Sequence, residues 1–189
     1  MDFTVTQWGG TTEQLLAYLD RESAAPQSKE RTCFQDWGHW RNLISYSLDV
    51  KKRNYEIPPK IFLAHRNGFG GLLILTKYQH TPAGEFYISF VCSTIAGGGD
   101  ALISHVKSML EVNVLKLSAV MGTQKFYVNQ GFRFQTHLDD PVFRRGEAQD
   151  MEMIWKKDEG YMADTEGGRR KRRKTRRSKK RVPLTKGRR

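Results

Sequence analysis

The pattern of apolar and polar positions is clearest in the middle of the chain. Residues 86–92 are mostly aromatic or β-branched, which is typical of a buried or half-buried strand. Three glycines at 97–99 then interrupt regular structure. After them, apolar residues recur at the three-to-four-residue spacing of one helix face, and Asp100 stands where it can cap that helix. The apolar positions of this helix are Leu102, Ile103, Val106, Met109 and Leu110.

This strand, glycine turn and helix form a candidate anion site. A helix start leaves unpaired backbone N–H groups beside the positive end of the helix dipole. Phosphate and pyrophosphate are the groups best suited to such a place. The alternative is a flexible loop without a ligand, because short glycine motifs occur often by chance.

The residues on either side predict a sheet built from both kinds of pairing. Residues 61–64 and 72–78 predict two strands that are joined by glycine-rich turns to each other and to the strand at 86–92, which implies an antiparallel meander. Residues 114–120 predict a further strand, and residues 150–156 predict a closing one. The helices between them fit crossovers, so we expect a mixed sheet.

The N-terminal third predicts a strand and two helices. Apolar residues at Phe3 and Val5 allow a first strand, and Thr11 with Gln14 matches a capping box at the start of a helix. Apolar residues from Trp37 to Leu48 fall three to four apart and predict a second helix, and residues 51–59 are expected to form a loop that ends at two prolines.

Two segments together resemble a known family. AGGGDAL at 96–102 is followed by a strand and then by FYVNQGF at 126–132, a helical segment ended by Gly131. This order is similar to the acetyl-CoA core of the GNAT acetyltransferases, and the resemblance runs over residues 62–155. It implies an α+β, GNAT-like acyl-CoA N-acyltransferase fold, with acetyl-CoA as cofactor and a primary amine as acceptor. The amino-acid sequences of the two motifs most resemble those of GNAT-like proteins of large DNA viruses.

The distribution of charged residues separates a basic C-terminal tail from the rest of the chain. Residues 169–189 contain 14 Lys or Arg and no acidic residue, which leaves 18 basic and 20 acidic residues before them, a net charge of −2. Such a run cannot bury enough apolar surface to fold alone. We therefore expect a GNAT-like domain over 1–159, a linker over 160–168 and a disordered basic tail over 169–189.

Composition also bounds the cellular setting. No apolar run reaches the length of a membrane span, and residues 1–10 lack the features of a signal peptide. Cys33 and Cys92 have no metal-ligand spacing, and Cys92, in a predicted strand, is expected to be a buried thiol. These features predict an intracellular protein without a metal site. If the basic tail is a localisation signal, we expect the protein in the nucleus or in a virion.

The resemblance implies a set of cofactor-binding residues. Backbone N–H groups at the glycines would hold the pyrophosphate, and the strand before them would pair with the pantetheine arm. This set comprises Val91, Cys92, Ser93, Gly97, Gly98, Gly99, Asp100 and Ala101. The chain departs from the family twice: Thr94 stands where an Arg or Gln is general, and Val120 where many members have an Asn.

The resemblance also implies catalytic residues. Tyr127 matches the tyrosine that in many members protonates the departing thiolate; the alternative is an aromatic residue of the core. No carboxylate occupies the strand interior, where many members have a glutamate. Glu85 at the strand's start is one candidate base, unless it is an exposed edge charge, and water relayed through Ser89 is the other.

Candidate acceptor residues are less distinctive. Asp139 and Asp140 lie in the loop before the last strand and can attract a cationic amine; a solvated turn before Pro141 is the alternative. Trp37, His39 and Trp40 either line an acceptor channel or belong to the core.

The tail predicts nucleic-acid binding or a nuclear address. Lys and Arg bind phosphates without reading sequence, and the same run serves as a nuclear address in a eukaryotic cell. A solvated tail is the alternative. The candidate nucleic-acid-binding residues are Arg169, Arg170, Lys171, Arg172, Arg173, Lys174, Arg176, Arg177, Lys179, Lys180 and Arg181.

Two function classes follow. The first is an N-acetyltransferase that modifies a protein lysine, an N-terminus or a polyamine, with a basic tail that holds it on nucleic acid or sends it to the nucleus. The second is a nucleic-acid-binding or virion structural protein on a GNAT fold with reduced catalysis, which the departures at Thr94 and Val120 favour.

Overall fold

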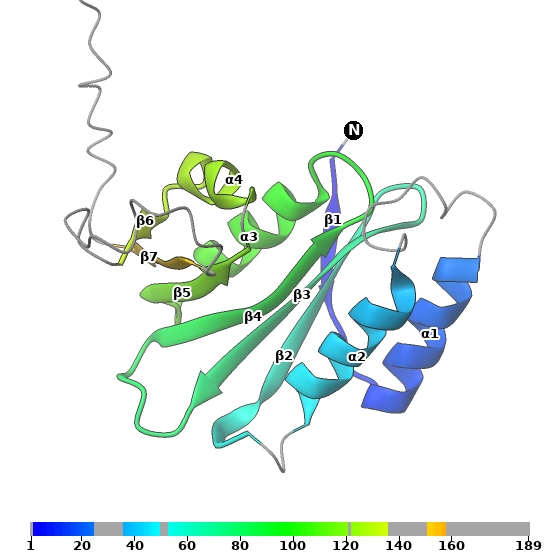
Figure 1. Cartoon of the computed structure of the whole chain (residues 1–189), viewed down its shortest axis with the longest axis horizontal. Coiled ribbons are helices and arrows are strands. Elements are labelled where there is room, and N and C mark those ends of the chain that lie inside the picture. Colours follow the sequence, from blue (N-terminus) through cyan, green and yellow to red (C-terminus); the bar gives the residue numbers. More distant parts are fainter. Residues whose placement is uncertain (1, 25–35, 50–52, 121, 136–150, 158–189) are drawn as a thin grey trace, which may run out of the picture.

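The structure is a computed structural model that describes residues 2–24, 36–49, 53–120, 122–135 and 151–157. These residues form four helices and one seven-stranded sheet in the order β1-β2-β3-β4-β5-β7-β6 (Figure 1). The basic tail, the linker, Cys33, Asp139 and Asp140 lie outside the described residues. The strands are β1 (Thr4–Gln7), β2 (Tyr55–His65), β3 (Phe69–Tyr78), β4 (Glu85–Ser93), β5 (Val114–Ala119), β6 (Arg133–Phe134) and β7 (Met151–Lys156). The helices are α1 (Thr12–Ala24), α2 (Trp37–Leu48), α3 (Gly98–Ser108) and α4 (Gln124–Asn129).

The sheet is mixed, as predicted. Strands β1 to β4 pair antiparallel in chain order, so β2, β3 and β4 form the expected meander. Strands β4 and β5 pair parallel across the α3 connection. Strand β7 then inserts between β5 and β6 and pairs antiparallel with both.

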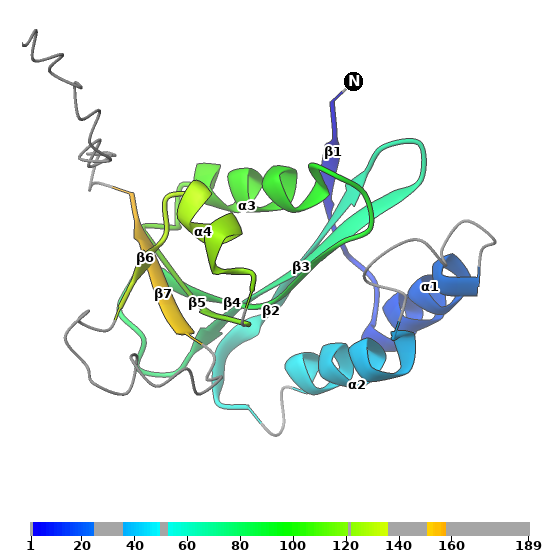
Figure 2. The ribbon, with the colours of Figure 1, turned by 45° about the horizontal axis from the view of Figure 1, so that its top comes forward.

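The helices cover the two faces of this sheet in separate layers (Figure 2). Helix α3 covers one face, and its cluster of buried side chains includes Phe62, Leu73 and Leu102. Helices α1 and α2 cover the other face, where the cluster includes Leu15, Ile44 and Ile74. Apolar burial on both faces explains why β3, which lies between the layers, is apolar through most of its length.

The capping box predicted before α1 is confirmed. The Thr11 N–H donates to Gln14 Oε1 at 2.9 Å, and the Gln14 N–H donates to Thr11 Oγ1 at 3.2 Å. Two N–H groups at the helix start are thereby satisfied by the helix's own side chains.

The loop predicted at 51–59 is wrong in its second half. Strand β2 begins at Tyr55 and runs through Pro58 and Pro59. Its register with β3 shifts between Tyr55 and Ile57 and again between Ile57 and Lys60. Proline has no N–H for a ladder bond, and irregular pairing of this kind accommodates it within a strand.

The start and end of α3 also correct the sequence analysis. Gly97, not Asp100, is the N-cap residue, and Asp100 lies in the first helical turn, where its carboxylate accepts a hydrogen bond from Gln130 Nε2. The helix ends at Ser108, so Met109 and Leu110 lie beyond it, and Leu110 is 90% exposed. Periodicity alone overestimated the helix because an apolar residue after the last turn still fits the pattern.

Cys92 is not the buried free thiol that the strand position suggested. It is partly exposed and disulfide-bonded. No helix in the described part of the chain is long and apolar enough to cross a bilayer.

Lys107 joins the end of α3 to the segment after α4. Its Nζ donates to the backbone carbonyl of Gln130 and lies 5.0 Å from the ring centroids of both Phe132 and Trp155. Burial lowers the pKa of Lys107 to about 8. Removal from water disfavours the charged ammonium, and this lowers the pKa although the side chain lies between two aromatic rings.

Candidate functional site

The central feature of the sheet is a divergence of β4 from β5. The two strands pair only where Glu85, Phe86 and Tyr87 face Val114, Leu115 and Lys116. Strand β4 then continues to Ser93 without β5, while β5 continues to Ala119 along β7. We call this divergence after Tyr87 and Lys116 the fork. Beyond the fork, β4 and β5 no longer pair with each other in the middle of the sheet, and a ligand can insert between their backbone edges.

A bulge in β4 accompanies the fork. Ile74 of β3 pairs with Phe90, but the next residue, Leu75, pairs with Ile88, so Ser89 is the extra residue. Ile88 packs in the cluster under α3, whereas Phe90 packs in the cluster under α1 and α2. Such a bulge bends the strand and changes which face its side chains point to, and bulges are common beside active sites.

A pocket of about 590 Å³ lies between the start of α3 and α4. The described residues that line it come from the end of β4, from the glycine loop at 94–97, from the start of α3 and from the start of α4. They are Val91, Ser93, Thr94, Ile95, Ala96, Gly97, Gly99, Asp100, Gly122, Thr123, Phe126 and Tyr127. Six of the predicted cofactor and thiolate residues thus meet in one place: Val91, Ser93, Gly97, Gly99, Asp100 and Tyr127. Gly98 and Ala101 are not among the described lining residues, and the Cys92 side chain packs toward α1 and α2.

Backbone donors at the start of α3 are available to a ligand. No described side chain caps Gly97, which has a left-handed φ of 86°. The Gly98 N–H donates to the Ile95 carbonyl, and the Ala101 N–H donates to the Gly97 carbonyl. Among the described residues nothing accepts from the N–H groups of Gly99 and Asp100. These two donors, at the positive end of an 11-residue helix, can bind an anion.

Two of the three glycines serve different needs. A Cβ on Gly98 would lie 2.4 Å from the Gly70 carbonyl oxygen and 2.7 Å from Ser93 Oγ, so packing against β3 excludes a side chain there. A Cβ on Gly99 would meet only the edge of the Phe126 ring, at 3.2 Å. Gly98 is therefore required by the fold, whereas Gly99 faces the pocket.

The pocket contains no side-chain cation. None of its described lining residues is Lys, Arg or His, and Asp100 adds a carboxylate. Thr94, at the position where the family has an Arg or Gln, is buried; its hydroxyl donates to the Phe69 carbonyl at 2.8 Å and its N–H to the Gly70 carbonyl at 3.0 Å. Its role in this structure is to fasten the glycine loop to the start of β3.

Tyr127 lies between two aromatic rings on the wall of the pocket. Its ring contacts Phe126 and Phe132 edge-on, with centroids 5.1 and 5.9 Å away. Burial raises the pKa of Tyr127 to about 12. The described residues supply no hydrogen bond to its hydroxyl. The side chain is therefore packed against the core and also lines the pocket.

Glu85 does not stand as an isolated carboxylate. Its Oε1 lies 2.6 Å from Lys116 Nζ, directly before the strands diverge. The hydrogen bond with Glu85 raises the pKa of Lys116. Ser89, the bulge residue, has its Oγ 2.6 Å from Thr76 Oγ1.

A smaller hollow of about 110 Å³ opens beside the fork. The described lining residues are Tyr87, Lys116, Leu117, Ser118, Gln135 and Glu152. Sequence analysis did not single out Lys116 or Glu152. Both occupy strand positions that alternate with buried apolar residues. This alternation is the sequence signal that could have assigned them to one face of the sheet together with Ser118.

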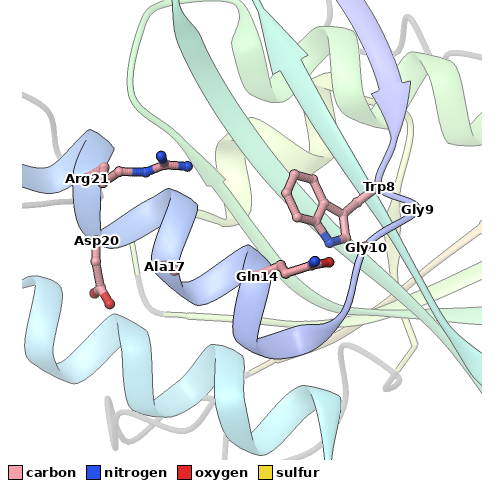
Figure 3. Close-up of a pocket in the computed structure, with 7 residues that line it drawn as sticks. All are labelled: Trp8, Gly9, Gly10, Gln14, Ala17, Asp20 and Arg21. Atoms are coloured by element: carbon pink, nitrogen blue, oxygen red, sulfur yellow. The ribbon is translucent and has the colours of Figure 1, made fainter.

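A second large hollow, of about 690 Å³, lies at the start of α1 (Figure 3). Trp8, Gln14 and Arg21 are among its lining residues. Gln14 is engaged in the capping box, and Asp20 accepts hydrogen bonds from Trp37 Nε1 and Arg41 Nε. This hollow offers no group suited to catalysis.

The aromatic residues proposed for an acceptor channel are divided. Trp37 and Trp40 pack against the cluster under α1 and α2, and Trp40 contacts Phe90 edge-on at 5.6 Å. These two belong to the core. His39 is exposed and contacts only the Trp40 ring among the described residues.

Comparison with known proteins gives a consistent result at the level of the fold. No family model and no curated protein matches the sequence. Among solved structures, a protein assigned to the GNAT acetyltransferases from Desulfovibrio desulfuricans matches with a TM-score of 0.53 at 14% identity, over 82% of this chain and 99% of that one. A GNAT-family acetyltransferase from Bacillus cereus matches with a TM-score of 0.49 at 15% identity, over 83% and 99%. The catalytic domain of Tetrahymena GCN5 histone acetyltransferase, in complex with coenzyme A, matches with a TM-score of 0.47 at 15% identity, over 82% and 92%.

The topology and the first of these matches agree. The described residues form a meander, a parallel fourth and fifth strand joined by α3, and a fork between those strands, and the first match covers 82% of this chain. The chain therefore has the GNAT acyl-CoA N-acyltransferase fold.

Proposed function

We propose that this protein is an acetyl-CoA-dependent N-acetyltransferase that acts on a primary amine: a protein lysine, an N-terminus or a polyamine. The fork is the observation that carries the proposal. Here β4 separates from β5 between the pocket that contains Tyr127 and the smaller hollow at Lys116. A thioester and an amine can therefore approach one another from two sides of the sheet.

The residues present fit an acyl-CoA in three respects. The N–H groups of Gly99 and Asp100 suit a pyrophosphate. The β4 edge at 91–93, which lies beyond the pairing with β5, suits the amides of a pantetheine arm, and the pocket has the volume of a ligand site. The cofactor would supply the activated acetyl thioester. We therefore assign the β4 backbone at 91–93 and the N–H groups of Gly99 and Asp100 to binding, whereas the N–H groups of Gly98 and Ala101 are used within the loop and helix.

Tyr127 is proposed to protonate the sulfur of the leaving group. With a pKa of about 12, its hydroxyl keeps its proton throughout the neutral range. A thiolate has a lower proton affinity than a phenolate, but a hydrogen bond from the hydroxyl stabilises the charge that develops on sulfur. Its position among Phe126 and Phe132 fixes the ring orientation.

Two routes remain for the proton of the amine. Glu85 is one candidate base, and water relayed through Ser89 is the other. The ion pair with Lys116 holds the Glu85 carboxylate at the paired end of the two strands, and this favours the second route.

The basic tail is proposed to bind nucleic acid or to direct the protein to the nucleus. Its 14 Lys or Arg within 21 residues support this assignment, together with the net charge of −2 of the rest of the chain. An origin in a large DNA virus, and Asp139 and Asp140 as attractors of a cationic acceptor, are further parts of the proposal that rest on sequence.

The second candidate is a binding protein that retains the fold without catalysis. Two observations favour it: Thr94 is turned inward, and Glu85 is engaged with Lys116. Both remove groups that the family commonly uses.

Ala96 offers a clean test because it is exposed and lines the pocket. Ala96→Glu should weaken the binding of acetyl-CoA by about tenfold, since the carboxylate repels the phosphates. Ala96→Gln, of the same size without the charge, should bind nearly as the parent does. Calorimetry with acetyl-CoA and release of free CoA with amine acceptors are the measurements.

Nucleic-acid binding should be equal in all three proteins, because it depends on the tail. If the parent protein binds no acetyl-CoA at millimolar concentration, the enzyme proposal is wrong and the second candidate stands. Binding without CoA release, across lysine peptides, N-terminal peptides and polyamines, would also favour the second candidate.

A further inference from the structure

The proposed cofactor site lacks a positive side chain of its own. Coenzyme A carries phosphate groups, whereas the described pocket lining contains no Lys, Arg or His and includes the carboxylate of Asp100. Two backbone N–H groups and a helix dipole supply only partial charge. A site for a polyanion usually adds a full cation, so a cation from a neighbouring element is expected.

The element that packs on the glycine loop is the turn between β2 and β3, residues 66–68, with the start of β3. The Thr94 hydroxyl and N–H are bonded to the carbonyls of Phe69 and Gly70. Gly98 approaches Gly70 so closely that a Cβ would lie 2.4 Å from its carbonyl oxygen. Figures 1 and 2 both show this turn next to the loop between β4 and α3.

Phe3 fills the space between the turn and the loop. Its ring would lie 3.2 Å from a Cβ on Gly97 and 2.9 Å from a Cβ on Gly70. The guanidinium carbon of Arg66 lies 5.5 Å from the centroid of the same ring. The Arg66 side chain is exposed and has no ion-pair partner among the described residues.

We propose that Arg66 is the phosphate-binding cation of the cofactor site, held toward the glycine loop by the face of Phe3. A guanidinium can donate two parallel hydrogen bonds to a phosphate, and stacking on an aromatic ring limits its freedom before binding. The proposal rests on the proposed function, because its ligand is the phosphate of an acyl-CoA. It names a binding residue that lies outside the two GNAT-like motifs.

The proposal also accounts for Thr94. A side chain at position 94 that pointed to the pocket would leave the loop unfastened from β3. With Thr94 turned inward, its two hydrogen bonds fasten the loop to Phe69 and Gly70 at the start of β3, directly after the turn that carries Arg66. The charge that is absent at position 94 is thus supplied from 28 positions earlier in the sequence.

Calorimetric titration of the full chain with coenzyme A tests the proposal. Arg66→Ala should raise the Kd about tenfold at low ionic strength, and the difference should shrink as salt is added. Arg66→Lys should recover part of the affinity, because it restores charge without the planar fork. Arg21→Ala is the matched control: Arg21 is also exposed, but it lines the separate hollow at α1 (Figure 3).

A second titration with dephospho-CoA identifies the group that Arg66 contacts. If the tenfold effect persists, Arg66 binds the pyrophosphate; if it disappears, Arg66 binds the 3′-phosphate. Equal Kd values for the parent, Arg66→Ala and Arg21→Ala would overturn the inference while the proposed function stands. Failure of the parent to bind coenzyme A would overturn both. The basic tail is present in every variant, so its contribution cancels.

Discussion

Replacing Gly98 with alanine should destabilise the whole domain, although only one methyl group is added. The new Cβ would lie 2.4 Å from the Gly70 carbonyl oxygen, whereas an ordinary contact begins at 3.4 Å. The start of β3 and the start of α3 must therefore separate by about 1.0 Å, the difference between these two distances. Neither side can yield easily, because the clash is with backbone and not with a flexible side chain.

The expected cost follows from what that separation breaks. Thr94 donates two hydrogen bonds to this strand, at 2.8 and 3.0 Å, and a shift of about 1 Å lengthens both beyond useful range. Each is worth about 0.5–1.5 kcal/mol, and overpacking adds about 1–3 kcal/mol. Gly98→Ala should therefore lower the free energy of unfolding by about 2–6 kcal/mol.

Gly99→Ala is the matched control. Its Cβ would meet only the edge of the Phe126 ring at 3.2 Å, which a shift of a few tenths of an ångström relieves. Alanine also has the higher helix propensity, by about 1 kcal/mol, so the net change should be within about 1 kcal/mol of zero. Urea unfolding followed by circular dichroism measures both variants. Equal midpoints for the two would refute the argument that Gly98 is required for packing on β3.

Three further predictions test individual side chains. Tyr127→Phe should keep the ring contacts and the affinity for acetyl-CoA but lower kcat by about 10²-fold or more, and an unchanged kcat would reduce Tyr127 to a core residue. The folded protein binds the Lys107 proton less tightly than the unfolded chain does. The free energy of unfolding of the parent, relative to that of Lys107→Met, should therefore rise between pH 8 and pH 10.5, the ordinary pKa of lysine, and be flat below pH 8. Urea titrations measure this difference, and a fall between pH 8 and pH 10.5 would contradict the lowered pKa of Lys107. Glu85→Gln and Lys116→Met break the same ion pair and should lower kcat/KM to a similar extent, whereas a loss confined to Glu85→Gln would identify Glu85 as the base.

The sequence was sufficient for the elements that depend on local chemistry. The capping box at Thr11 formed both of its hydrogen bonds, and the meander of β2, β3 and β4 follows from glycine-rich turns between apolar runs. The start of β2 was missed because Pro58 and Pro59 oppose strand structure locally, while register shifts against β3 make room for them. The start of β2 therefore depended on whether the neighbouring strand could compensate for a local preference against strand structure.

The candidate site was predictable only in part, for a related reason. Val91, Ser93, Gly97, Gly99 and Tyr127 were identified from segments close in sequence, and they do line one pocket. Two contacts of charged side chains depend on segments that are distant in sequence. Periodicity within a segment contains no information about which distant segment will be its neighbour, so the Lys116 partner of Glu85 and the position of Arg66 beside Phe3 required the sheet topology.

The bulge at Ser89 limits how far along β4 the facing of side chains can be inferred from simple alternation. Counting every second residue places Glu85, Tyr87 and Ser89 on one face, but the extra residue in β4 reverses the alternation from Phe90 onward. A carboxylate at Glu85 therefore lies where the strands are still paired, and it stabilises the closed end of the fork through Lys116. The same bulge leaves Ser89 just beyond the last β4–β5 pair. The residue that interrupts the alternation therefore lies in the part of β4 that no longer pairs with β5, and its hydroxyl contacts Thr76 of β3.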